Sequence, residues 1–400
     1  MTADCDAVGD AAMHTFQPVP ELAVAAALKA GTDNDCGKTY SRVIPSALNK
    51  SIITEDLLDE RLSMLWKVRL RLGHFDPIGP LDEIQPAGTV CSDEAVQTSL
   101  EGVIQGAALL KNVGKALPLS AASVGRIALV GPNANYSFGA PTRSDPHAYY
   151  GPGKLCPQTK YWTAIDALSK YSSHVSYVAG VPEATSNDTT GIAAAVDLVK
   201  AADTTVLAIG TDKTWASEGH DAGQINFTVA QQQLIDQTLA ASTTPVVVLL
   251  LSAVPMDISQ LLASPKVGAV LHLGQPSVTI LGAAELLFGK VAPSGRTVQT
   301  FYAAEYQDQI SIFDFNSEQM SNFTTMCIHA LITCVLALIA VRPGKSPFAR
   351  PDCFDSNPVA CPRGTNPGRT HRFFTGRPVV PFGFGLSYTV RTRAIFSPVS

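Results

Sequence analysis

Two acidic stretches of the chain contain side chains whose types and spacing suit acid–base chemistry. The first is Asp4-Cys5-Asp6, and the second runs over residues 210–221 and contains Trp215 and Glu218. A carboxyl group can donate or accept a proton, and a neighbouring indole ring offers an apolar surface that suits the face of a sugar. We therefore predict a site at Glu218, with a solvated acidic loop as the alternative interpretation.

Other common catalytic signatures are missing from the sequence. It contains no G-x-S-x-G elbow, no Walker loop, no H-E-x-x-H and no C-x-x-C, and its eight histidines are dispersed. The formal charge is −5, whereas a nucleic-acid-binding protein needs a basic face. We predict no metal, no organic cofactor and no nucleic-acid partner.

The second acidic stretch follows directly on residues 204–209, an apolar segment that we predict to be a strand. Further apolar strands are predicted at 126–130, 174–178, 245–251 and 267–271, alternating with predicted helices at 93–111, 163–171, 191–201, 229–241 and 277–288. Alternating helices and continuously apolar strands are typical of a parallel sheet that is covered on both faces. Ligands of such sheets bind outside the carboxyl ends of the strands, where residues 210–221 would lie.

Earlier in the chain, the sequence predicts a long helix and a domain boundary. Thr54 is the predicted N-cap of a helix that runs to about residue 72, because two acidic residues and an apolar stripe follow it. The Pro- and Gly-rich segment 75–88 then indicates a boundary. The uncharged run 326–341 is shorter than the roughly 20 residues of a membrane-spanning helix, so a membrane anchor is the less favoured interpretation.

Six motifs along the chain resemble, in order, those of glycoside hydrolase family 3, in its β-xylosidase-like branch. They are Asp4-Cys5-Asp6-Ala7-Val8; Lys29-Ala30-Gly31-Thr32-Asp33-Asn34-Asp35-Cys36-Gly37; Arg71-Leu72-Gly73-His74-Phe75-Asp76-Pro77; Leu109-Leu110-Lys111-Asn112 with Leu117-Pro118-Leu119; Leu287-Phe288-Gly289 with Pro293-Ser294-Gly295-Arg296; and Gly368-Arg369-Thr370 with P-F-G-F-G-L-S-Y-T at 381–389. Six ordered matches over nearly the whole chain make this resemblance highly specific.

The resemblance implies an α/β fold, in which the C-terminal remnant of a (β/α)8 barrel is followed by an α/β sandwich with a parallel sheet. We expect the barrel remnant at 1–75, a linker at 76–90, the sandwich at 91–310 and its C-terminal tail at 342–400. The apolar segment 317–341 interrupts the family pattern, and we interpret it as an insertion from a gene-model error. A barrel of about 250 residues cannot close from such a remnant, so we expect the strands that grip the sugar to be missing.

The resemblance also implies roles for individual residues. Asp4 matches the catalytic nucleophile, and Glu218 is the remaining acid/base candidate, because Ala216 stands where relatives have the first glutamate of this loop. Retaining glycosidases hold two such carboxyl groups about 5–5.5 Å apart, so we expect Asp4 and Glu218 to face each other. The predicted substrate-binding residues are Cys5, Asp6 and Trp215, with a solvated role as the alternative for Asp6.

The implied function is that of a retaining, exo-acting β-xylosidase-like hydrolase. It would release xylose or arabinose from the ends of xylan-derived oligosaccharides. This chain alone is expected to be weakly active or inactive, because positioning of the substrate supplies much of the rate enhancement. A non-catalytic sugar-binding remnant and a β-glucosidase-like hydrolase are the alternatives.

Several further features of the sequence concern the cellular compartment of the protein and its cysteines. The sequons at Asn49, Asn135, Asn187, Asn226 and Asn322 favour a secreted glycoprotein. No signal peptide follows Met1, so we expect the natural N-terminus to lie upstream. Of the eight cysteines, Cys353 and Cys361 are near enough in sequence to form a disulfide, with free thiols as the alternative. The sequence does not define an oligomeric state.

Overall fold

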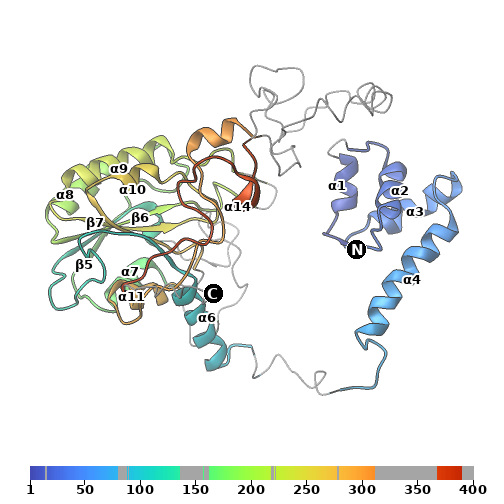
Figure 1. Cartoon of the computed structure of the whole chain (residues 1–400), viewed down its shortest axis with the longest axis horizontal. Helices are drawn as coiled ribbons and strands as arrows, with labels where there is room; N and C mark the ends of the chain where they lie inside the picture. The colour runs from blue at the N-terminus through green and yellow to red at the C-terminus, as the bar shows by residue number, and fades with distance from the viewer. Residues whose placement is uncertain are drawn as a thin grey trace, which may run out of the picture. The chain divides into compact units, whose positions relative to one another are not determined.

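The structure is a computed structural model, and it describes residues 1–13, 16–79, 88, 90–135, 156, 162–217, 220, 222–276, 279–310 and 367–389. The described residues form two compact units (Figure 1). Those up to residue 79 belong to the first unit and those from residue 88 onwards to the second. The predicted insertion 317–341 lies outside the described residues, as do Cys353 and Cys361.

The first unit contains a short pair of parallel strands and four helices. Strands β1 (Thr2–Ala3) and β2 (Asn34–Asp35) pair so that Ala3 lies opposite Asp35. The helices are α1 (Ala7–Met13), α2 (Pro20–Lys29), α3 (Thr39–Asn49) and α4 (Glu55–Arg71). The small core consists of Val8, Val24, Ala25, Leu28, Ala47 and Ile53. Parallel strands joined through helices are the building unit of a (β/α)8 barrel, in agreement with the predicted fold class.

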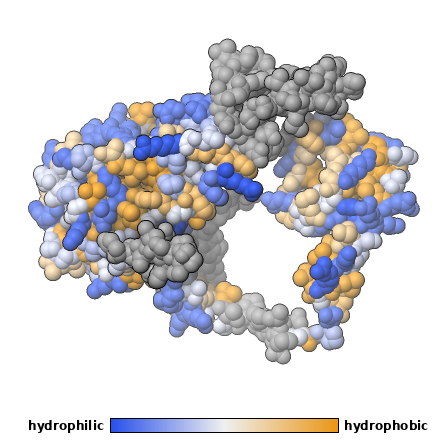
Figure 2. All heavy atoms as spheres, in the orientation of Figure 1, coloured by the Kyte–Doolittle hydropathy of each residue, from blue (hydrophilic) through white to orange (hydrophobic). Residues whose placement is uncertain are grey.

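Helix α4 begins as predicted at Thr54, whose side-chain oxygen accepts a hydrogen bond from the backbone N–H of Leu57 (3.3 Å). Its later turns carry exposed apolar side chains, among them Trp66 (42% exposed) and Leu72, just after the helix (78% exposed). Figure 2 shows the apolar surface of this helix. A helix with apolar residues on several sides is normally buried, so the first unit presents more apolar surface than its own core uses.

The second unit is built on a six-stranded sheet in the order β3-β8-β7-β6-β4-β5. The strands are β3 (Ala108–Asn112), β4 (Ile127–Val130), β5 (Val175–Val178), β6 (Thr204–Gly210), β7 (Val246–Leu251) and β8 (Val267–His272). Neighbouring strands are parallel except β3 and β8, which pair in antiparallel orientation. The predicted strands are confirmed, and the predicted parallel sheet is correct apart from this edge.

The edge strand corrects one sequence-based prediction. A single helix is predicted over 93–111, whereas the structure has α6 (Asp93–Gly106) followed directly by β3. Leu109 is fully buried and lies opposite Leu271 of β8. This pairing with a distant strand supplies backbone hydrogen bonds and burial, which override the local helical preference.

Helices cover both faces of the sheet, as Figure 1 shows. On one face, α8 (Ile192–Lys200), α9 (Val229–Ala241) and α10 (Ser259–Ala263) pack on strand residues that include Leu207 and Ile209. On the other face, α7 (Ala164–Ser169) and α11 (Gly282–Leu287) pack on residues that include Val206 and Leu249. Successive residues of one strand thus enter opposite cores, which makes this unit an α/β sandwich.

The described C-terminal residues return to this sandwich. Residues 367–389 begin near α14 (Thr370–Phe373), and they form bridges from Val380 to Phe301 and from Leu386 to Leu109. Throughout the described ranges, the helices are too short or too polar to traverse a lipid bilayer.

Candidate active site

Asp4, the predicted nucleophile, follows directly on β1 and is exposed on the first unit. The backbone N–H of Cys5 donates a 2.7 Å hydrogen bond to Asp4 Oδ1. The Asp4 carbonyl oxygen accepts a second bond from the N–H of Ala7, the first residue of α1 (3.1 Å). These bonds define the turn between strand and helix, and they leave the Asp4 carboxylate open at the carboxyl end of the strand.

The turn that contains Asp4 is tied to the end of β2. A disulfide joins Cys5 to Cys36, and the N–H of Asp6 donates to the Cys36 carbonyl oxygen (2.6 Å). Gly37 lies so close that a Cβ atom there would meet Asp6 Oδ1 at 2.4 Å, which explains why this position is glycine. The spacing of the cysteines in the sequence does not predict this pairing. Cys5 therefore presents a disulfide rather than a thiol, and its role at the substrate remains a prediction, like that of Asp6.

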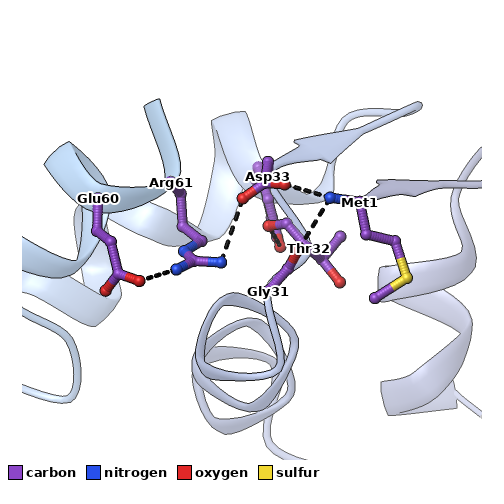
Figure 3. Close-up of polar contacts among 7 residues, drawn as sticks. Met1, Gly31, Thr32, Asp33, Glu60 and Arg61 are labelled. Atoms are coloured by element: carbon purple, nitrogen blue, oxygen red, sulfur yellow. Dashed lines mark hydrogen bonds and ion pairs between the residues drawn. The ribbon is translucent and has the colours of Figure 1, made fainter. Parts of the chain in front are cut away.

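A largely buried ion pair between α4 and the residue before β2 also stabilises the pairing of β1 and β2 (Figure 3). Arg61 Nη1 of α4 lies 3.2 Å from Asp33 Oδ1, just before β2. The N–H of Asp33 donates to the carbonyl oxygen of Met1 (2.7 Å), and the Met1 amino group donates to the Gly31 carbonyl oxygen (3.1 Å). Sequence reasoning did not single out this pair, although Asp33 belongs to the second family motif.

In the second unit, Asp212 organises the loop after β6, and its side chain is 1% exposed. Asp212 Oδ1 accepts bonds from the backbone N–H of Thr214 (2.9 Å) and of Trp215 (3.2 Å) and from the Thr214 hydroxyl (2.5 Å). Asp212 Oδ2 accepts from the N–H of Ala184, in the segment after β5 (3.0 Å). The carboxylate therefore joins two strand ends. Its sequence signal is the Asp-x-Thr spacing, since aspartate often bonds the backbone two residues further on.

The neighbouring strand β4 adds a further buried contact. Asn133 Nδ2, in the turn after β4, donates to the carbonyl oxygen of Thr211 (3.0 Å). From β4 the chain continues to β5 on one side, whereas from β6 it continues to β7 on the other. Ligands of doubly wound sheets bind at this kind of topological switch point, so the loop after β6 lies where a ligand is expected.

Trp215 has a different environment from the one predicted. Its side chain is 4% exposed and belongs to the apolar core of the second unit. Its indole Nε1 donates to the carbonyl oxygen of Gln224 (3.2 Å). The ring thus anchors the loop by packing, and this burial gives no support to the predicted contact with a sugar face.

Glu218, the predicted acid/base, lies outside the described residues, as does Asp221. The described residues on either side of it, Ser217 and His220, exchange two backbone hydrogen bonds of 2.8 and 2.9 Å. Asp4 and Glu218 belong to different units, each of which is described by itself, so their approach remains a prediction. In the part of the chain that the structure describes, no group of three or more His, Cys, Asp or Glu residues could hold a metal ion.

The sandwich fold and the acidic loop at the carboxyl edge of its sheet suit a glycoside hydrolase. Residues 107–388 match the glycosyl hydrolase family 3 C-terminal domain. The chain therefore belongs to glycosyl hydrolase family 3, as its motifs predict.

Two curated relatives are named as xylosidases. The chain is 34% identical over 399 residues to the probable exo-1,4-β-xylosidase xlnD of Neosartorya fischeri, which covers 97% of this chain and 43% of that protein. It is 31% identical over 393 residues to the probable β-D-xylosidase 6 of Arabidopsis thaliana, with the same two shares of 97% and 43%. The chain thus spans less than half the length of these relatives.

Solved structures also match the chain. The structure of the GH3 exo-β-xylosidase XlnD in complex with a xylobiose aziridine activity-based probe matches at a TM-score of 0.72 and 27% identity, over 97% of this chain and 44% of that one. A β-glucosidase from Listeria innocua in complex with isofagomine matches at a TM-score of 0.64 and 23% identity, over 97% and 47% of the two chains. The second match shows a shared fold only.

Proposed function

We propose that this chain is the C-terminal part of a retaining β-xylosidase-like hydrolase that releases xylose or arabinose from the ends of xylan-derived oligosaccharides. The observation that carries the proposal is the 34% identity, over 97% of the chain, to a probable exo-1,4-β-xylosidase. The β-glucosidase match has only 23% identity, so a glucoside substrate is less well supported.

In the proposed mechanism, the Asp4 carboxylate attacks the anomeric carbon and forms a glycosyl-enzyme, while Glu218 protonates the departing oxygen. Glu218 then takes a proton from the water that releases the sugar. Two structural features support these roles. Asp4 stands open at the end of β1 in a turn that a disulfide secures, and the loop after β6 is fastened by Asp212.

A non-catalytic sugar-binding protein is the second candidate. Such a protein would bind a xylan-derived sugar without cleaving it. We expect weak or absent turnover from this chain alone, because a sugar held by only part of a site is poorly positioned for attack.

The test combines turnover with covalent trapping. The chain is incubated with an aryl β-xyloside and, separately, with a xylobiose aziridine probe, and the labelled peptide is identified by mass spectrometry. We expect the label on Asp4 and no label in Asp4→Asn, and any turnover by wild type should fall at least about 100-fold in Asp4→Asn and Glu218→Gln. Asp59→Asn, on the exposed surface of α4, is the matched control and should behave as wild type.

A label on another residue, or measurable turnover that is equal in wild type and Asp4→Asn, would contradict the assignment of the nucleophile. Specific xylose binding without label or turnover would favour the second candidate for this chain.

We also propose that the protein is a secreted glycoprotein. Two disulfides, Cys5–Cys36 and Cys91–Cys156, support an oxidising compartment. The asparagines of three sequons, Asn49, Asn135 and Asn187, are exposed and accessible to glycosylation.

A further inference from the structure

A cavity of about 270 Å³ lies at the carboxyl end of β8 in the second unit. It is lined by part of α6, by the last residue of β8 and residues 273–276, by Thr279 and by residues 296–298. Strand β8 is two positions from β6 in the sheet, and none of the described residues 211–217 of the loop after β6 lines this cavity. Among the described residues that line it, none is acidic.

His272, the last residue of β8, is a lining residue whose imidazole is neutral. Burial lowers the pKa of its imidazole, so the ring is uncharged at neutral pH. His272 Nε2 lies 3.1 Å from the carbonyl oxygen of Ser252 and must carry the proton, because a carbonyl oxygen only accepts. The other nitrogen, Nδ1, is therefore assigned as the unprotonated acceptor.

Gln275 contributes an uncommitted amide to the same lining. Its Oε1 and Nε2 are both buried, and neither has a hydrogen-bond partner in the part of the chain that the structure describes. A buried amide without partners is unfavourable for folding, so stability does not account for a glutamine here. Because no bond holds the carboxamide, rotation of the side chain can present its donor and its acceptor to a ligand.

The remaining polar groups of the cavity are donors and hydroxyls. Arg296 Nη1 donates to the carbonyl oxygens of Ser294 and Gly295 (2.9 Å each), and its guanidinium is exposed. The hydroxyls of Ser99 and Thr279 lie 3.2 Å apart. An amide, a neutral imidazole, hydroxyls and one guanidinium together match the alternating donors and acceptors of a polyhydroxylated ligand.

We propose that this cavity is a second, non-catalytic binding site for one neutral sugar unit. The volume is below the range of about 300–1,000 Å³ that is usual for drug-sized ligands, which suits a single ring. The mixed donors and acceptors suit hydroxyl groups. Hydrolysis is not needed for such binding, and neither Asp4 nor the described loop residues Asp212 and Trp215 are among the lining residues.

Titration with D-xylose, followed by protein-observed NMR, tests the site, and the His272 ring signals report where the sugar binds. Wild type should bind in the millimolar range, as expected for so small a ligand, with a shift of the His272 signals. Gln275→Leu should weaken this binding at least tenfold. It should leave the thermal unfolding temperature unchanged or higher, because an unpaired buried amide is replaced by an apolar group of similar size.

Gln97→Leu is the matched control, since Gln97 lies on the exposed surface of α6 and bonds Glu101. It should bind xylose as wild type does. Equal binding in Gln275→Leu and wild type, or a lower unfolding temperature in Gln275→Leu without loss of binding, would overturn the proposal.

Two further binding measurements distinguish this site from the proposed catalytic site and from a site for anions. Asp4→Asn and Glu218→Gln should retain the xylose-induced shift of His272, whatever their effect on turnover. Loss of the shift in those variants would place the sugar at the catalytic residues and refute a second site. Sodium D-glucuronate should bind no more tightly than xylose, and tighter binding would instead identify a site for anions at Arg296.

Discussion

The two units of this chain use their apolar residues in opposite ways. In the second unit, β6 and β7 are buried along almost their whole length, and each contributes to two cores. In the first unit, the core is small, and the long helix α4 has no buried residue. A disulfide and an ion pair hold the strands that carry Asp4. The second unit thus satisfies its own packing, whereas the first relies on local cross-links and leaves apolar surface free.

The largest expected effect concerns the packed core of the second unit. Leu207→Ala, at a fully buried position of β6, should lower the free energy of unfolding of that unit by about 2–5 kcal/mol, because it removes apolar contacts and leaves a cavity. Hydrogen exchange followed by mass spectrometry, read on peptides of each unit, measures this change. Faster exchange confined to the first unit would refute the comparison.

A smaller effect is expected from the cross-link of the first unit. Cys5→Ser combined with Cys36→Ser opens a loop that spans 31 residues, which should cost about 2–4 kcal/mol by restoring freedom to the unfolded chain. Exchange should quicken in β1, α1 and β2 and stay unchanged in the second unit. Wild type under reducing conditions is the companion measurement. A double variant with the exchange profile of wild type would show that the strand pairing and Arg61 suffice.

The smallest effect is expected at Leu72, just after the last residue of α4. Leu72→Gln should change the stability of the first unit by no more than about 0.5 kcal/mol, because Leu72 is exposed and loses little contact. Leu28→Ala, in the small core of the same unit, is the contrasting variant and should be clearly destabilising. A large loss of stability in Leu72→Gln would show that the apolar surface of α4 is covered in solution.

Much of the fold could be predicted from the sequence because the relevant signals are local. The apolar run 245–251 predicts a strand buried on both faces, and the structure has β7 there. Thr54 predicts the start of α4, since an N-cap depends only on a side chain and the next turn of backbone. The ordered motifs indicated the family in the same way, and the family match confirms it.

The parts that sequence reasoning missed depend on contacts between distant segments. Leu109 was predicted to be helical, yet it lies in a strand because β8 offers it a partner. The pairing of Cys5 with Cys36 follows from the register of β1 and β2, which cysteine spacing alone does not reveal. In the sequence, Asp212 and Trp215 are a polar and an aromatic residue of one loop, and the neighbouring residues do not show that both of them are buried.

By itself, then, the sequence determined most strands and helices, the start of α4 and the family of the chain. Periodicity, capping and motifs depend only on residues that are close in the sequence. The tertiary structure alone decided that Asp212 fastens two strand ends, that Trp215 is buried and that Gln275 has no hydrogen-bond partner among the described residues. Burial and hydrogen bonding of these side chains depend on segments far away in the chain, and such distances are set only when the sheet has formed.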